Sequence, residues 1–70
     1  MEHLIDVCWD DEARVWIATC DSIPLALESN SFDALIERVK IAVPELLVAN
    51  NINHDSSQLC FRAERWDNIA

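Results

Sequence analysis

Two spacings of apolar residues meet at Ser29-Asn30-Ser31, and this change constrains the fold more than any other feature of the chain. Before it, Leu25 and Leu27 alternate with their neighbours as in a short strand over residues 25–28. After it, apolar residues recur at the spacing of a helix with a broad apolar stripe. They are Phe32, Leu35, Ile36, Val39, Val43, Leu46 and Leu47. Such a helix has to pack on a sheet.

Residues 4–9, 14–20 and 58–64 have the alternation and the composition of further strands. Polar or Pro-containing segments separate these elements at residues 10–13, 21–24 and 50–57. The chain contains no Gly, so the first hairpin cannot use an Asn-Gly or Asp-Gly turn. We expect a four-residue loop at Asp10–Ala13, built around a type I turn.

The helix has a recognisable start and an interruption. Ser31 is the expected N-cap, and Asp33 in the first turn suits the positive end of the helix dipole. Pro44 removes the N–H group that would bond the Lys40 carbonyl. Either a kink or a restart at Pro44 is therefore expected, with the helix ending by Asn50.

The sequence thus predicts one α+β domain over residues 1–70, ordered β-β-β-α-β. An antiparallel meander is joined by a fourth strand, and the helix covers one face of the sheet. The other face is expected to be an uncovered, partly apolar interface. Its expected residues are Asp6, Cys8, Trp16, Ala18, Cys20, Ala26, Glu28, Cys60, Arg62 and Glu64. A register slip of one residue would exchange the faces but still leave one uncovered.

The charge of the chain restricts its partners. Thirteen acidic and five basic residues give a net charge of −8. Direct binding to nucleic acid is not expected, because phosphates are bound by Lys and Arg. A basic protein would be attracted instead, although a solvated acidic surface is the simpler explanation of the charge. No apolar run is long enough to span a bilayer, and Met1-Glu2-His3 does not resemble a signal peptide, so we expect a cytoplasmic location.

Residues that could carry chemistry are few, and each has a simpler structural interpretation. Three widely spaced cysteines within strands are expected to be reduced and buried rather than metal-bound; they are Cys8, Cys20 and Cys60. His3 and His54 are expected to be solvated.

The acidic run Asp10-Asp11-Glu12 is expected to be a solvated hairpin tip rather than a cation site. A Gly-rich phosphate loop is impossible in a chain without Gly. We therefore predict no enzyme activity, catalytic residue, cofactor or metal. Trp66 either anchors the tail or contacts a partner.

One stretch combines four successive elements: Val15-Trp16-Ile17-Ala18, Asp21-Ser22-Ile23-Pro24, Leu25-Ala26-Leu27-Glu28 and Ser31-Phe32-Asp33-Ala34-Leu35. This stretch resembles the HicB antitoxin domain. Ala42-Val43-Pro44-Glu45-Leu46-Leu47 and Arg62-Ala63-Glu64-Arg65 add to the similarity, which is greatest for small bacterial proteins of unknown function that are grouped with HicB.

The resemblance implies a β-β-β-α-β unit, similar to a reduced RNase H-like sheet, that masks a small basic ribonuclease toxin. It also implies dimers or higher oligomers. HicB proteins usually have Gly after the turn Pro, where this chain has Leu25. We expect no separate DNA-binding domain, and so do not carry over DNA binding.

The functional hypothesis is a non-enzymatic HicB-like protein-binding module that neutralises a toxin. The alternative is a stand-alone homo-oligomer that associates through its uncovered sheet face, and a residual nuclease ranks third. For partner binding the sequence singles out Trp16, Cys20, Glu28 and Arg62, with Asp10, Asp11 and Glu12 at the edge of the face.

Overall fold

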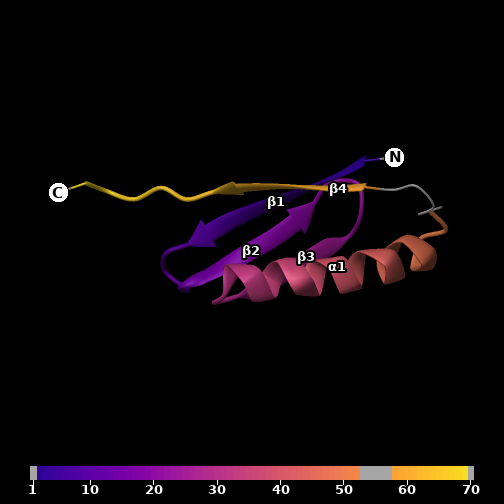
Figure 1. Cartoon of the computed structure of the whole chain (residues 1–70), viewed down its shortest axis with the longest axis horizontal. Coiled ribbons are helices and arrows are strands. Elements are labelled where there is room, and N and C mark those ends of the chain that lie inside the picture. Colours follow the sequence, from indigo (N-terminus) through magenta and orange to yellow (C-terminus); the bar gives the residue numbers. More distant parts are fainter. Residues whose placement is uncertain (1, 53–57, 70) are drawn as a thin grey trace.

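The predicted α+β order is confirmed by a computed structural model, which describes residues 2–52 and 58–69. In these residues the elements are β1 (Glu2–Asp10), β2 (Val15–Cys20), β3 (Leu25–Ser29), α1 (Phe32–Ala49) and β4 (Gln58–Glu64). Figure 1 shows α1 along the β3 side of the sheet, with β4 on the opposite side. None of the described residues forms a helix with the length and apolarity needed to cross a bilayer.

The sheet is mixed, with the strand order β3-β2-β1-β4. The first three strands form the predicted antiparallel meander, and β4 then pairs with β1 in parallel. A parallel pair needs a long crossover connection, which α1 and the residues after it provide. The N-terminal strand therefore lies inside the sheet, between β2 and the C-terminal strand.

Both ends of α1 are capped by side-chain or backbone bonds. Ser31 is the N-cap, as predicted, and its hydroxyl accepts a hydrogen bond from the Ala34 N–H at 3.2 Å. At the C-terminus, Asn51 adopts a positive φ of 57°, a conformation that usually calls for Gly. Around it, the Ile52 N–H donates to the Leu47 carbonyl at 2.8 Å and the Asn51 N–H to the Val48 carbonyl at 3.1 Å. This is a Schellman cap made without Gly.

Pro44 lies inside one continuous helix, so the two-piece alternative is wrong. The bond lost is the one to the Lys40 carbonyl, and both Pro44 and Lys40 are exposed. Water can bond this carbonyl on the solvent side of the helix, which makes the loss tolerable.

The core lies between α1 and one face of the sheet. The helix contributes Leu35, Val39, Val43 and Leu47, at most 2% exposed, in agreement with the predicted stripe. The sheet and the turn before β3 contribute Ile5, Val7, Ala18, Ile23 and Leu25.

The predicted orientation of β2 is wrong. Val7 pairs with Ala18, and Trp9 with Trp16, so both β2 residues share the buried face of β1. Ala18 is completely buried as a result. Trp16, Ala18 and Cys20 therefore face α1, while Val15, Ile17 and Thr19 lie on the uncovered face.

We expect truncation of Val39 to Ala to lower the free energy of unfolding by about 2 kcal/mol, because two buried methyl groups are lost and a cavity remains. Val48 is 62% exposed on the same helix and offers a matched control. Val48→Ala changes helix propensity equally but should alter stability by no more than about 0.5 kcal/mol. Urea unfolding of both variants measures the difference, and equal effects would contradict the core assignment.

Candidate functional site

The sheet face opposite α1 is covered by no element among the described residues, and we call it the open face (Figure 1). Its two central strands, β2 and β1, present apolar and small side chains together with Asp6, and its two outer strands present Glu28, Arg62 and Glu64. In sequence order it presents Glu2, Leu4, Asp6, Cys8, Asp10, Val15, Ile17, Thr19, Ala26, Glu28, Gln58, Cys60, Arg62 and Glu64. Glu28 and Arg62 are therefore on this face, as predicted, but Trp16 and Cys20 are not.

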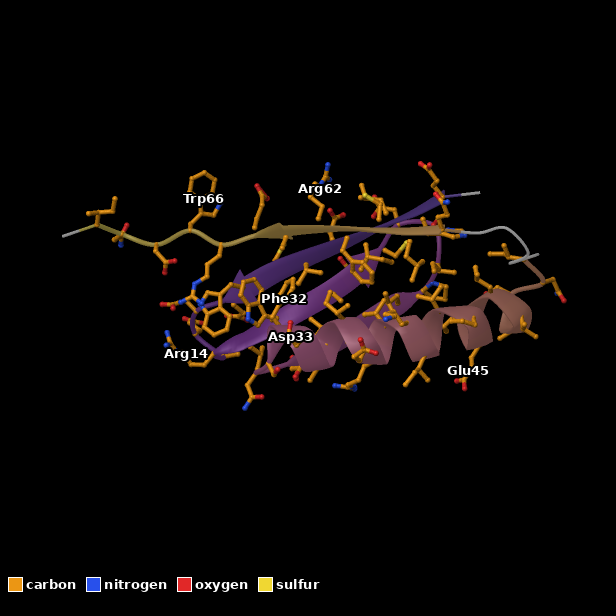
Figure 2. All side chains as sticks on the ribbon, in the orientation of Figure 1. Arg14, Phe32, Asp33, Glu45, Arg62 and Trp66 are labelled. Atoms are coloured by element: carbon orange, nitrogen blue, oxygen red, sulfur yellow. The ribbon has the colours of Figure 1, made fainter. Side chains whose placement is uncertain are left out.

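Negative charge dominates the open face. Its one Arg, Arg62, is paired with Asp6 at 3.1 Å across the β1–β4 register. Figure 2 shows Arg62 directed away from α1. Glu28 and Glu64 are exposed and form no ion pair with any described residue. The face therefore has net negative charge, and its apolar part is the strip of Val15, Ile17 and Cys8 beside the Asp6–Arg62 pair.

The acidic hairpin is held together by its own carboxylates. Its loop is Asp11–Arg14, one residue later than predicted, because Asp10 pairs with Val15 at the end of β1. Asp10 Oδ1 accepts from the N–H groups of Glu12 and Ala13, at 3.1 and 3.2 Å. Arg14 closes the loop at a φ of 58°, with its N–H donating to the Asp10 carbonyl at 2.8 Å.

Asp11 completes this arrangement at the loop surface. Its Oδ1 accepts from Arg14 at 2.8 Å and from the Trp9 Nε1–H at 3.2 Å. Two of the three acidic side chains thus hold the loop, and Glu12 remains exposed in it. No group of three or more His, Cys, Asp or Glu side chains that could hold a metal ion occurs within residues 2–52 and 58–69.

Trp16 belongs to an aromatic cluster at the α1 side of the sheet. Its ring lies 5.3 Å from that of Trp9 and 5.1 Å from that of Phe32, both in edge-to-face geometry. The Arg65 guanidinium stacks over Trp9, with its carbon 4.4 Å from the ring centroid. The chain therefore uses Trp16 for internal packing, and the contact of Arg65 with Trp9 holds the segment after β4.

His3 is buried, so the prediction of a solvated side chain is wrong. It is 2% exposed, and its Nδ1 lies 2.9 Å from the Ser22 hydroxyl. That hydroxyl also lies 3.3 Å from the Cys20 thiol. His3 Nε2 has no hydrogen-bond partner among the described residues. The small polar cluster ties β1 to the turn before β3. His54 lies outside the described residues.

The cysteines also depart from expectation. Cys8 and Cys60 are exposed on the open face, and Cys20 is half-buried on the α1 side. The prediction of three buried thiols is therefore wrong. The reason is that β1 and β4 turn these side chains toward the sheet face that α1 does not cover.

Trp66 is a candidate binding residue that sequence reasoning left unassigned. It is 88% exposed, and Figure 2 shows it directed to the same side as Arg62. The segment after β4 thus places a large aromatic side chain beside the open face. Alternation from Arg62 through Glu64 to Trp66 was the sequence signal that could have identified it.

Comparison with known proteins gives one family and one solved structure. The model of the family described as "Domain of unknown function (DUF1902)" matches residues 2–69. The chain is also similar to the crystal structure of hypothetical protein TTHA1013 from the extremely thermophilic bacterium Thermus thermophilus, with a TM-score of 0.76 and 30% sequence identity. This similarity covers 100% of the present chain and 99% of that one. No curated protein matches the chain.

Thiol reactivity should separate the two sheet faces. Cys8 and Cys60 are expected to react rapidly with a chromogenic disulfide reagent in the folded protein, and Cys20 slowly, because exposure governs access to the sulfur. Cys8→Ser should remove one fast equivalent, whereas Cys20→Ser should leave both fast equivalents. A fast thiol lost in Cys20→Ser would show that β2 is oriented the other way.

Proposed function

The chain belongs to the DUF1902 family, and from its open face we propose that it is a non-enzymatic module that binds a basic protein. The observation that carries this proposal is a sheet face with an apolar strip around Ile17, unpaired carboxylates on its outer strands and no covering element among the described residues. A sheet face that contacts only water would not need the apolar side chains of Leu4 and Ile17.

The negative charge of the open face indicates that the partner is positively charged. The chain carries a net charge of −8, and Arg62 on the open face is already paired with Asp6. A cationic protein would gain long-range attraction to this surface and would meet no unpaired Arg on it. The apolar strip around Ile17 would supply the desolvated centre of the contact.

The resemblance to HicB gives this partner a more specific identity. The main stretch that carries the resemblance forms β2, the turn after it, β3 and the start of α1, and the two further segments lie in the second half of α1 and at the end of β4. By analogy, the partner is a small basic ribonuclease toxin whose active surface is covered on binding. Masking of this kind requires no catalytic group in the present chain. This agrees with the acidic hairpin, where two of the carboxylates accept hydrogen bonds within their own loop.

The decisive experiment is to look for a small basic protein encoded beside this chain and to reconstitute the two; the absence of any such protein would count against the toxin partner. We expect a complex of fixed stoichiometry, loss of RNA cleavage by the basic protein, and protection of Cys8 and Cys60 from the disulfide reagent. Glu64→Lys on the open face should weaken the complex by about tenfold or more, or about 1.4 kcal/mol.

Glu37→Lys is the matched control for Glu64→Lys. Glu37 is exposed on α1, and either reversal takes the net charge from −8 to −6. If both variants weaken the complex equally, the loss of affinity is due to the net charge of the chain and not to the position of Glu64 on the open face. A complex that leaves Cys8 and Cys60 reactive would place the contact elsewhere and overturn the assignment of the open face.

Trp66 provides a second, independent prediction. Because it is 88% exposed, Trp66→Ala should leave the unfolding midpoint nearly unchanged. If it is buried by the basic partner, the same variant should raise the Kd by about thirtyfold, as expected for an aromatic hot spot of about 2 kcal/mol. Ile69→Ala, 99% exposed further along the same segment, is the control. Calorimetric titration of both variants measures the difference, and an unchanged Kd in Trp66→Ala would remove this residue from the interface.

A further inference from the structure

A groove runs between α1 and the outer edge of β3, on the side of the molecule away from β4. It contains a cavity of about 460 Å³, lined mainly by apolar residues of the two elements. An adjoining cavity of about 220 Å³ is lined by Leu27, Arg38, Ile41, Ala42 and Glu45. Ile41 is 67% exposed there. The edge of β3 is one of the two free edges of the sheet.

We propose that this groove and strand edge bind a second copy of the chain. The two β3 strands pair in antiparallel fashion around a twofold axis at Leu27, and the two α1 helices pack beside each other across the same axis. The sheets of the two copies then become one continuous sheet, with both helices on the same face.

The free edge of β3 has the hydrogen-bonding groups that such pairing needs. Arg38 on α1 donates to the Glu28 carbonyl at 2.7 Å, which shows that this carbonyl points outward from the sheet. Outward and inward residues alternate in an antiparallel strand, so Ala26 also directs its N–H and carbonyl outward. Around an axis at Leu27, Ala26 of each copy would pair with Glu28 of the other, giving about four backbone hydrogen bonds. No two glutamates would be directly opposed.

The surface of α1 at the groove is complementary in charge to the same surface of a second copy. Arg38 lies three residues before Ile41, and Glu45 lies three residues after Ala42. A twofold axis between Ile41 and Ala42 therefore brings Arg38 of each copy to Glu45 of the other. In the dimer Arg38 would exchange its bond to the Glu28 carbonyl for this ion pair, and the carbonyl would accept from the Ala26 N–H of the second copy. Glu45 forms no ion pair with any described residue, and Figure 2 shows it projecting from the outer side of α1. Self-complementarity of this kind is what a twofold interface requires.

Two independent centres of symmetry coincide at the groove. The charges place the axis between Ile41 and Ala42, and the strand places it at Leu27. Leu27 lines the same cavity as Ile41 and Ala42, so the two centres lie at one level of the molecule.

The spacing of the elements agrees with this geometry. α1 packs on β3 and β2. If each helix lies midway above these two strands, the strand spacing of about 4.8 Å puts the helices of a β3–β3 pair about 10 Å apart. Packed helices have interaxial distances of about 8–10 Å. The exposed Ile41 side chains would then be buried between the helices.

Charge exchange tests the proposal. Sedimentation over a range of protein concentrations should show a dimer for the unmodified chain. Glu45→Arg alone should raise the dimer dissociation constant at least tenfold, because Arg38 of one copy would face an Arg on the other. The double variant Arg38→Glu with Glu45→Arg should restore association to within about threefold of the original, as the pairs are re-formed with reversed sign.

The remaining outcomes are equally decisive. Ile41→Lys should abolish the dimer, whereas Lys40→Ala, on an exposed residue outside the cavities, should not. Circular dichroism checks that each variant is folded. Cys8 and Cys60 should stay reactive in the dimer, because its interface is not the open face. A monomer at all concentrations, a dimer insensitive to Ile41→Lys, or a double variant no better than Glu45→Arg would overturn the proposal.

Discussion

Burial of one apolar stripe of α1 against one face of the sheet is the interaction on which the other features depend. Leu35, Val39, Val43 and Leu47 are almost wholly removed from water by this contact. A hydrophobic side chain of this size contributes about 1.5–3 kcal/mol when buried, so the stripe is a major part of the stability of a small domain. Since the described residues include one helix, covering one face leaves the other open. The position of α1 over β2 and β3 likewise creates the groove at the β3 edge.

Features with a local physical cause could be predicted from the sequence. The helical stripe, the Ser31 cap and the bounds of β4 at residues 58–64 all follow from neighbouring residues, and all agree with the structure. The effect of Pro44 on the continuity of the helix was overestimated, because the Lys40 carbonyl that loses its hydrogen bond lies on the solvent side of α1. Glu28 and Arg62 were assigned to the open face correctly because their strands alternate clearly between apolar and polar residues.

Features that depend on pairing between distant segments could not be predicted in the same way. β2 is apolar on both faces, so its composition does not orient it. The hairpin loop orients this strand instead. A four-residue loop, at its predicted or its observed position, places Trp16 on the same face of the sheet as Trp9. His3 is buried through the parallel pairing of β1 with β4, which has no local sequence signal. The exposed Cys8 is a consequence of the same two pairings, one on each side of β1.

The parallel pairing of β1 with β4 also has a consequence for how the chain acquires its structure during synthesis. β1 leaves the ribosome before the other three strands of the sheet, yet one of its edges has no neighbour until β4 has been made. During this interval the nascent chain presents an unpaired edge along a strand that contains Ile5 and Val7. Such an edge is a template for strands of other nascent chains. Early completion of the C-terminal segment, or a chaperone that shields β1, would shorten this exposure.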